Sequence, residues 1–144
     1  MGRMQRLIFN QNFTLPRDQV FAYFAEHENL GPMFGAKIKR LNDGTDGQRN
    51  GVGSVRQLRV GPTPPFEETI TEVEPDKRIV YKITKGSPLR NHRGEMLFTD
   101  NGQGGTHLRY EIAFTGAVPG LGAIVAAGLK RNIAKGLAGA PGAS

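Results

Sequence analysis

The sequence contains no cysteine among its 144 residues. A chain without thiols forms no disulfide, no thiolate zinc site and no cysteine-ligated iron–sulfur cluster, and it has no cysteine nucleophile. The three histidines, His27, His92 and His107, are far apart in the sequence, so we expect no metal site. We predict a single domain over residues 1–144, because a chain of this length can bury a substantial core without disulfides or metal.

Long apolar segments are lacking as well. The N-terminal stretch, Met1–Arg6, carries basic residues without an apolar run behind them, so we predict no signal peptide and a cytoplasmic protein. The stretch Ala117–Leu129 is apolar, but it is too short to span a bilayer and is interrupted by Pro119 and three glycines. We interpret it as part of a buried amphipathic helix and predict no integral membrane segment.

Motifs for nucleotide binding and acyl transfer are missing. The stretch Gly120–Val125 lacks the third glycine of a dinucleotide fingerprint, and the sequence has no Gly-Lys-Ser/Thr phosphate loop. No Gly-x-Ser-x-Gly elbow presents a serine nucleophile. The sequence therefore favours a protein without a cofactor.

The charge of the chain is positive but dispersed. The 19 lysines and arginines outnumber the 13 acidic residues and give a net charge of +6. Basic residues form only two small clusters, Lys37–Arg40 and Lys130–Arg131, and elsewhere they are interleaved with acids. Because nucleic-acid-binding proteins gather their basic residues in a patch or stripe, we predict a solvated basic surface and no nucleic-acid partner.

Strand and turn patterns occupy most of the chain. We predict a first strand over Arg6–Leu15, a helix from Pro16 to about Ala25, and a second short helix or turn over Glu28–Phe34. Turns rich in Gly, Pro, Asn and Asp then separate six strands, at Ala36–Leu41, Gly51–Val60, Phe66–Glu74, Arg78–Lys85, Leu89–Asp100 and Thr106–Thr115. Short turns make consecutive strands antiparallel neighbours.

One long apolar helix, from about Pro119 to Leu137, follows the last strand. Its larger apolar side chains recur every four residues: Leu121, Val125, Leu129, Ile133 and Leu137. A single helix after a run of antiparallel strands must cover one face of the sheet, because neither element can otherwise bury its apolar side. Small residues such as Ala126 and Gly128 leave room beneath this helix.

These elements define the expected fold class, which is α+β. One strand, two short helices, six strands and one long helix predict a curved antiparallel sheet of about seven strands that wraps around the C-terminal helix. The small residues of the helix predict a cleft between helix and sheet. Only the tail, Gly139–Ser144, is expected to be frayed.

Strand alternation assigns side chains to the two faces of the sheet. In the last strand, His107 faces outward, and one set faces the helix: Leu108, Tyr110, Ile112 and Phe114. The same alternation directs a further set inward: Ile79, Tyr81, Ile83, Arg90, His92, Met96 and Phe98. We expect His27 on or beyond the end of the first helix, where it interacts with helix carbonyls.

Arg56 and Glu68 form the most informative polar pair. Registers of the hairpin that joins their strands place them near each other on the same face of the sheet. On the inner face they form a partly buried ion pair, whose desolvation cost points to ligand recognition or another functional role. On the outer face they form a solvated cross-strand pair. The sequence leaves both interpretations open.

The element order and three segments resemble a known family. The segments Gly51–Arg56, Glu68–Pro75 and Gly104–Thr106 are similar to those of the polyketide cyclase/dehydrase-like branch of the START/Bet v 1 (SRPBCC) superfamily. The resemblance implies a helix-grip fold with a deep apolar pocket between the sheet and the long helix. Members bind lipids, sterols, polyketides or plant hormones, and some are cyclases, aromatases or dehydratases. The resemblance supplies no catalytic motif that can be transferred residue by residue.

Alternation and resemblance together predict a ligand-binding cavity. The expected ligand-binding residues are Phe34, Arg56, Glu68, Ile70, Tyr81, Ile83, His92, Met96, Phe98, Tyr110, Ile112, Val125 and Leu129. If the cavity is catalytic, Glu68 or His92 is the candidate acid or base, and Arg56 is the candidate group that polarises a carbonyl. Tyr81 or Tyr110 can donate a hydrogen bond to an oxyanion, or they are core and ligand-contact residues.

Three classes of function follow from these observations. The first is a carrier or sensor for a small hydrophobic ligand of lipid, polyketide or aromatic type. The second is an enzyme of the cyclase, aromatase or dehydratase type that uses acid–base residues in the same cavity. The third is a protein-interaction module whose basic outer surface contacts an acidic partner. The exposed sheet edges also permit a homodimer.

Overall fold

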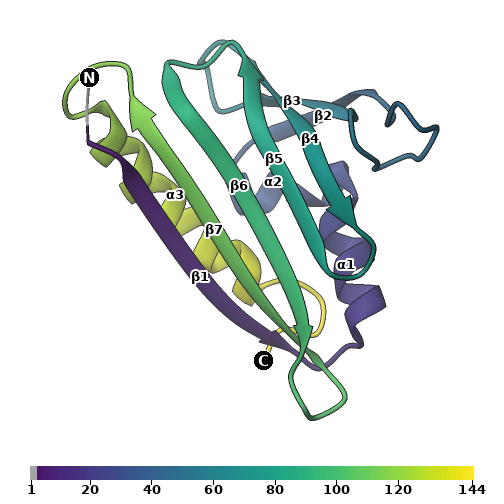
Figure 1. Cartoon of the computed structure of the whole chain (residues 1–144). Coiled ribbons are helices and arrows are strands. Elements are labelled where there is room, and N and C mark those ends of the chain that lie inside the picture. Colours follow the sequence, from purple (N-terminus) through teal and green to yellow (C-terminus); the bar gives the residue numbers. More distant parts are fainter. Residues whose placement is uncertain (1–2) are drawn as a thin grey trace.

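Seven strands form one antiparallel sheet in the computed structural model, which describes residues 3–144 (Figure 1). The strands are β1 (Gln5–Phe13), β2 (Lys37–Asn42), β3 (Val55–Arg59), β4 (Phe66–Glu74), β5 (Arg78–Lys85), β6 (Leu89–Asp100) and β7 (Thr106–Gly116). Their spatial order is β1-β7-β6-β5-β4-β3-β2, so the first strand pairs with the last and β1 and β2 form the edges. The first two residues of Met1–Arg6, the stretch interpreted as lacking a signal peptide, lie outside the described residues.

The helices pack against one face of this sheet. Between β1 and β2 lie α1 (Arg17–Ala25), the 3-10 helix η1 (His27–Leu30) and α2 (Gly31–Phe34), and the chain ends with α3 (Leu121–Ala138). Figure 1 shows α3 lying across the sheet behind β7 and β1, with α1 and α2 towards β4 and β5. This arrangement confirms the predicted α+β fold. No helix within residues 3–144 is long and apolar enough to cross a membrane.

Side-chain alternation places the core between the sheet and the helices. In β7, Leu108, Tyr110, Ile112 and Phe114 are all buried, as their spacing predicts. From α3, Ile133 and Leu137 pack into the same core, whereas Val125 and Leu129, nearer its N-terminal end, are only partly buried. The helix therefore packs closely against the rest of the protein at its C-terminal half and leaves more space at the other end.

The C-terminal tail is ordered against β1, which corrects the expectation of a frayed tail. The amide of Thr14 donates to the carbonyl of Gly142 at 2.7 Å, and the amide of Ser144 donates to the carbonyl of Asn12 at 3.0 Å. Ala143 forms a bridge with Phe13, and Ala140 is buried. A composition rich in small residues suggested disorder, but these residues allow the backbone to approach the end of β1 closely.

A bulge in β6 overturns the predicted inward orientation of Arg90. Arg90 and Arg93 are three residues apart, yet they pair with positions two apart on β7. The extra residue is accommodated at Asn91, whose φ is 54°. Because a bulge shifts the alternation of the strand, Arg90 is exposed, whereas the side chain of His92 remains on the inner face.

The strand predicted over Gly51–Val60 is shorter in the structure and begins at Val55. Gly53 has a φ of 89°, a left-handed conformation that ends regular strand geometry. The chain still follows β4 here, because the amide of Gly53 donates to the carbonyl of Ile70 at 2.8 Å. This irregular turn places the side chain of Ser54 inside the protein, where it is fully buried.

Candidate functional site

An apolar cavity of about 600 Å³ lies between the sheet and the N-terminal half of α3. Three strands, β3, β4 and β5, the start of β6, and the two loops that join β3 to β4 and β5 to β6 contribute to its walls. The lining consists of Phe34, Leu58, Val60, Thr63, Pro64, Phe66, Glu68, Tyr81, Ile83, Gly86, Ser87, Pro88, Leu89, His92, Ile112, Ile124, Val125, Gly128, Leu129 and Asn132. Most of these side chains are aliphatic or aromatic, so the cavity suits an apolar molecule.

Small residues of α3 keep this cavity open, as its sequence predicts. Gly128 lines the cavity, and a Cβ atom added there would have no neighbouring atom within 4 Å. Ile124, one turn earlier, is 73% exposed, and Val60 on the facing strand end is 40% exposed. Both line the cavity, so its mouth lies where these exposed apolar side chains meet solvent.

Eight of the thirteen expected ligand-binding residues line the cavity: Phe34, Glu68, Tyr81, Ile83, His92, Ile112, Val125 and Leu129. The other five are absent from its lining and are buried in the surrounding core: Arg56, Ile70, Met96, Phe98 and Tyr110. For these thirteen residues, alternation in the strands identifies the inner face correctly. It does not tell which part of that face the cavity occupies and which part the helices cover.

Phe98 illustrates the difference. Its ring packs against Phe21 and Phe24 of α1, with ring centroids 5.3 and 6.2 Å away. The segment from β1 to β2 folds over this end of the sheet, so the inner face of β6 is covered there by α1. A contact between helix and strand so far apart in sequence leaves no trace in the local pattern of either segment.

Arg56 and Glu68 are direct cross-strand partners on the inner face of β3 and β4. The Nε atom of Arg56 donates to Oε1 of Glu68 at 2.8 Å, and both side chains are at most 5% exposed. Of the two interpretations that the sequence leaves open, the structure supports the buried ion pair. Such a pair loses hydration and is held in one geometry by its surroundings.

Aromatic rings enclose the guanidinium of Arg56. Its Cζ atom lies 4.7 Å from the ring centroid of Tyr81 and 5.7 Å from that of Phe34. The Nη2 atom lies 2.8 Å from Oε1 of Glu68, but without hydrogen-bonding geometry; among the described residues it is the one fully buried side-chain nitrogen or oxygen lacking a hydrogen bond. The carboxylate of Glu68, the two ring faces and, through Nη1, the side chain of His27 therefore hold the cation.

His27 is fully buried and belongs to this polar network, which corrects its expected place beside helix carbonyls. Its Nδ1 atom accepts a hydrogen bond from Nη1 of Arg56 at 3.1 Å, and its Nε2 atom lies 3.0 Å from Oγ of Ser54. Since arginine can only donate, the neutral ring carries its hydrogen on Nε2 and donates it to Ser54. Burial, and then the charge of Arg56, lowers the pKa of His27 to about 3.

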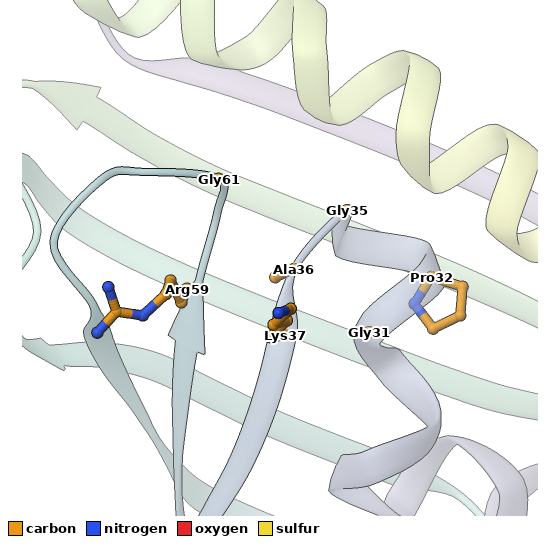
Figure 2. Close-up of a pocket in the computed structure, with 7 residues that line it drawn as sticks. All are labelled: Gly31, Pro32, Gly35, Ala36, Lys37, Arg59 and Gly61. Atoms are coloured by element: carbon orange, nitrogen blue, oxygen red, sulfur yellow. The ribbon is translucent and has the colours of Figure 1, made fainter.

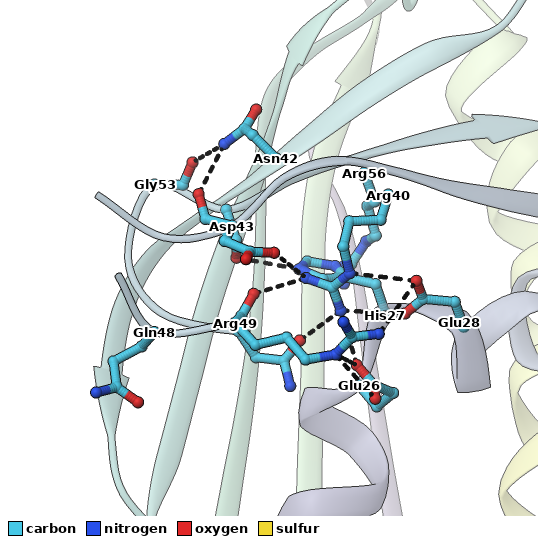
Figure 3. A network of polar contacts seen from close by, with 12 residues as sticks. Glu26, His27, Glu28, Arg40, Asn42, Asp43, Gln48, Arg49, Gly53 and Arg56 are labelled. Atoms are coloured by element: carbon cyan, nitrogen blue, oxygen red, sulfur yellow. Dashed lines mark hydrogen bonds and ion pairs between the residues drawn. The ribbon is translucent and has the colours of Figure 1, made fainter. Parts of the chain in front are cut away.

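A surface network anchors the backbone on either side of His27 (Figure 3). Arg40 of β2 donates to Oε1 of Glu26 at 2.7 Å and to Oε1 of Glu28 at 3.0 Å. Arg49 shares the first of these carboxylates, with Nε 2.9 Å from Oε1 of Glu26. Because these two glutamates flank the histidine in sequence, the network ties η1 to β2 and fixes the position of His27.

His92 contributes a polar group to the cavity wall. Its Nδ1 atom accepts the backbone N–H of Ile83 at 2.9 Å, so the neutral ring carries its hydrogen on Nε2. Nε2 lies 3.9 Å from Oε2 of Glu68, which is too long for a hydrogen bond. Burial lowers the pKa of His92; Glu68 opposes this shift and Arg56 adds to it. His92 is therefore a neutral hydrogen-bond donor at pH 7.

Tyr81 and Tyr110 form a buried pair, because their hydroxyl groups contact each other. Burial is the main cause that raises the pKa of both phenols, and the charge of Glu68 raises that of Tyr81 further. Both phenols are therefore neutral at pH 7. Tyr81 lines the cavity, but its hydroxyl is engaged by Tyr110.

A second hollow, of about 570 Å³, lies on the outside of the protein between α2, the start of β2 and the end of β3 (Figure 2). It is lined by Gly31, Pro32, Gly35, Ala36, Lys37, Arg59 and Gly61. Lys37 and Arg59 are cross-strand partners, and both are exposed. None of the expected ligand-binding residues lines it. Residues 3–144 contain no cluster of three or more side chains suited to hold a metal ion.

This protein belongs to the polyketide cyclase / dehydrase and lipid transport family, whose sequence model matches residues 10–140. Among curated proteins, none matches the sequence. The fold is shared with solved structures of low sequence identity. The Zhui aromatase/cyclase from Streptomyces sp. R1128 superimposes with a TM-score of 0.69 at 16% identity, over 93% of this chain and 87% of that chain.

Two further structures extend the comparison. A norcoclaurine synthase variant from Thalictrum flavum, in complex with a transition state analogue, has a TM-score of 0.61 at 11% identity, with 94% of each chain covered. An uncharacterised protein from Bacillus thuringiensis has a TM-score of 0.64 at 20% identity, over 92% of this chain and 96% of that chain. These structural similarities show the fold, and the family match over residues 10–140 places the protein in the polyketide cyclase-like branch of the SRPBCC superfamily.

Proposed function

We propose that this protein binds a small hydrophobic ligand, of lipid, polyketide or aromatic type, in the cavity between the sheet and α3, and acts as its carrier or sensor. The observation that carries the proposal is the apolar cavity of about 600 Å³. Small-molecule sites in proteins typically enclose about 300–1,000 Å³ and combine apolar walls with few polar groups. The polar end at Glu68 and His92 fits this description.

The mouth of the cavity supports exchange of a ligand with the surroundings. Ile124 and Val60 are exposed although both are large and apolar. An apolar ligand seated at the mouth would cover such side chains and gain the free energy of removing them from water. Gly128 adds open space beneath the same part of α3.

The first experiment is native mass spectrometry of the purified protein, followed by denaturing extraction and identification of any small molecule that dissociates. Binding of the neutral dye Nile red then compares the wild type with Gly128→Leu, whose side chain enters the cavity. Ala127→Leu is the matched control, because it adds the same side chain to the exposed face of the same helix. We expect Gly128→Leu to weaken dye binding at least tenfold and Ala127→Leu to leave it unchanged. Equal binding by all three proteins would refute a ligand site in this cavity.

A second function, an enzyme of the cyclase, aromatase or dehydratase type, is favoured by the carboxylate of Glu68 at the cavity wall. Its Oε2 atom has no hydrogen-bond donor among the described residues, so it is the candidate base. His92 accepts a backbone N–H through Nδ1, so it can only donate to a substrate. A carrier returns its extracted ligand unchanged after incubation, whereas an enzyme converts it, and Glu68→Gln should abolish that conversion.

A further inference from the structure

Three hydroxyl groups around the cavity already have partners. The hydroxyl of Thr63 donates to the carbonyl of Val60, and Oγ of Ser87 accepts the amide of Leu89 at 3.1 Å. The hydroxyl of Tyr81 contacts that of Tyr110. Each of these hydroxyl groups already has a hydrogen-bond partner within the protein, so none of them requires a polar atom on the ligand.

In the described part of the chain, Glu68, His92 and Asn132 have polar atoms without such a partner, and of these Glu68 and His92 lie next to each other. Oε1 of Glu68 accepts from Arg56, but Oε2 has no donor among the described residues, and Nε2–H of His92 has no acceptor within hydrogen-bond distance. The two atoms are 3.9 Å apart. A single oxygen atom can therefore lie about 2.8 Å from both, donating a hydrogen to one and accepting a hydrogen from the other. Of the chemical groups with one oxygen, a hydroxyl does both.

The charges around this position exclude an anion. Within residues 3–144, Glu68 is the one charged residue that lines the cavity, and the lining contains no lysine or arginine. The nearby guanidinium of Arg56 is already paired with Glu68, and His27 and His92 are neutral at pH 7. A carboxylate on the ligand would face the carboxylate of Glu68 and would lose its hydration without gaining a counterion.

We infer that the cavity selects a neutral apolar molecule with a hydroxyl group, which donates to Oε2 of Glu68 and accepts from Nε2 of His92, and that it rejects the matching carboxylate. The inference rests on the proposed function, because it names the class of ligand for the same cavity. Phenols and apolar alcohols belong to the class that is selected. Fatty acids and aromatic acids belong to the class that is rejected.

Three small aromatic probes test the inference on the wild-type protein at pH 7 by calorimetry. The probes are naphthalene, 2-naphthol and 2-naphthoate, which share one ring system and differ in the polar group. We expect 2-naphthol to bind about tenfold more tightly than naphthalene, since it gains two hydrogen bonds, and 2-naphthoate to bind at least tenfold more weakly than 2-naphthol. A merely apolar cavity predicts the opposite order for the first two, because the hydroxyl makes 2-naphthol the more water-soluble molecule.

Two variants assign the effect to the named side chains. His92→Phe removes the donor and should reduce the preference for 2-naphthol over naphthalene at least threefold. Glu68→Gln removes the negative charge and leaves Arg56 without a counterion, so the ratio of 2-naphthoate to 2-naphthol affinity should rise at least tenfold. If this variant is unstable alone, the inference predicts that 2-naphthoate raises the melting temperature of the variant more than it raises that of the wild type.

The outcomes separate this inference from the proposed function. Absence of binding for all three probes, together with absence of Nile red binding, contradicts the proposed function. Binding of all three with naphthalene equal to or tighter than 2-naphthol contradicts the hydroxyl selection and leaves the apolar site intact. Binding of 2-naphthoate as tightly as 2-naphthol contradicts the rejection of anions. The wild-type measurements decide each of these cases without a variant.

Discussion

The ring of Tyr81 lies directly over Gly94, its partner across strands β5 and β6. A Cβ atom added at Gly94 would overlap the Cζ, Cε1 and hydroxyl oxygen atoms of that ring. The missing side chain thus lets the ring lie flat on the neighbouring strand, where its face meets the guanidinium of Arg56 and its hydroxyl reaches Tyr110. Glycine inside a strand often marks such a close approach.

We predict that Gly94→Ala destabilises the protein by about 2–3 kcal/mol, because overpacking a filled core forces side chains out of their rotamers. Urea denaturation measures the change in the free energy of unfolding. Tyr81→Leu removes the overlapping atoms, so Gly94→Ala should cost less than about 1 kcal/mol in that background. An equal cost in both backgrounds would show that the strand, rather than the ring, requires glycine.

The buried histidine His27 makes stability depend on pH. Its pKa is about 3 in the folded protein, against an ordinary value of 6.5. Below pH 6.5 the histidine of the unfolded chain takes up a proton that the histidine of the folded protein does not. The free energy of unfolding therefore falls as the pH falls from 6.5 towards 3, and it is unaffected by this histidine above pH 6.5. One such histidine removes about 1.4 kcal/mol per pH unit, or about 2 kcal/mol at pH 5. His92, whose pKa is also lowered, acts in the same direction.

Urea denaturation between pH 5 and 8 measures this dependence, and His27→Gln is the test variant. A glutamine amide can accept from Arg56 and donate to Ser54 but does not titrate. We expect the variant to lose about half of the pH dependence between pH 5 and 6.5. A wild-type protein that gains stability on acidification over this range would show that His27 is charged in the folded state.

Regular elements of the fold could be predicted from the sequence because their signals are local. Alternation and turn residues define β4 and β5 with the same bounds as the structure, Phe66–Glu74 and Arg78–Lys85. The hairpin between β3 and β4 limits the register of these two strands. The sequence therefore pairs Arg56 with Glu68, although it does not decide which face of the sheet they occupy. Hairpins bring together residues that are close in sequence, and their geometry follows from alternation.

The polar network around His27 could not be predicted in this way. Its partners are Ser54, in the turn before β3, and Arg56 on β3, and nothing in the short segment around His27 indicates burial. The inner-face position of Ser54 depends on the turn at Gly53, and the outward position of Arg90 depends on the bulge at Asn91. Such irregularities break the alternation on which the sequence argument depends, and they are set by tertiary packing.

Arg56 and Glu68 should show strong coupling in a double-mutant cycle. Arg56→Met leaves a buried carboxylate without its partner, and Glu68→Leu leaves a buried guanidinium; each should destabilise the protein by about 3–5 kcal/mol. The double variant replaces the pair with apolar groups and should lose only about 1–2 kcal/mol, much of it from the unpaired Nδ1 of His27. Thermal or urea denaturation gives all three values. Additive losses would mean that the two charges do not stabilise each other.

Two glycines of α3 should respond to the same substitution with opposite signs. Alanine favours a helix by about 0.8–1.0 kcal/mol over glycine, so Gly128→Ala, whose new methyl group enters open cavity, should stabilise the protein by about 0.5–1 kcal/mol. Gly136, two turns later, approaches α2 so closely that a Cβ atom would lie 2.6 Å from Cα of Met33. Gly136→Ala must displace backbone and should destabilise by about 1–3 kcal/mol despite the same gain in helix propensity.

Melting temperatures of the two alanine variants test this contrast, and urea denaturation gives their free energies of unfolding. Because both positions lie in one helix, the gain in helix propensity from glycine to alanine is the same for both variants. The difference between their free energies of unfolding therefore reports the space beside each glycine. Gly136 lets α3 approach α2 closely, and Gly128 leaves open space on the cavity side of the same helix. Equal stabilisation by both substitutions would show that α3 can move away from α2 at little cost, and the helix would then be free to act as a lid over the cavity.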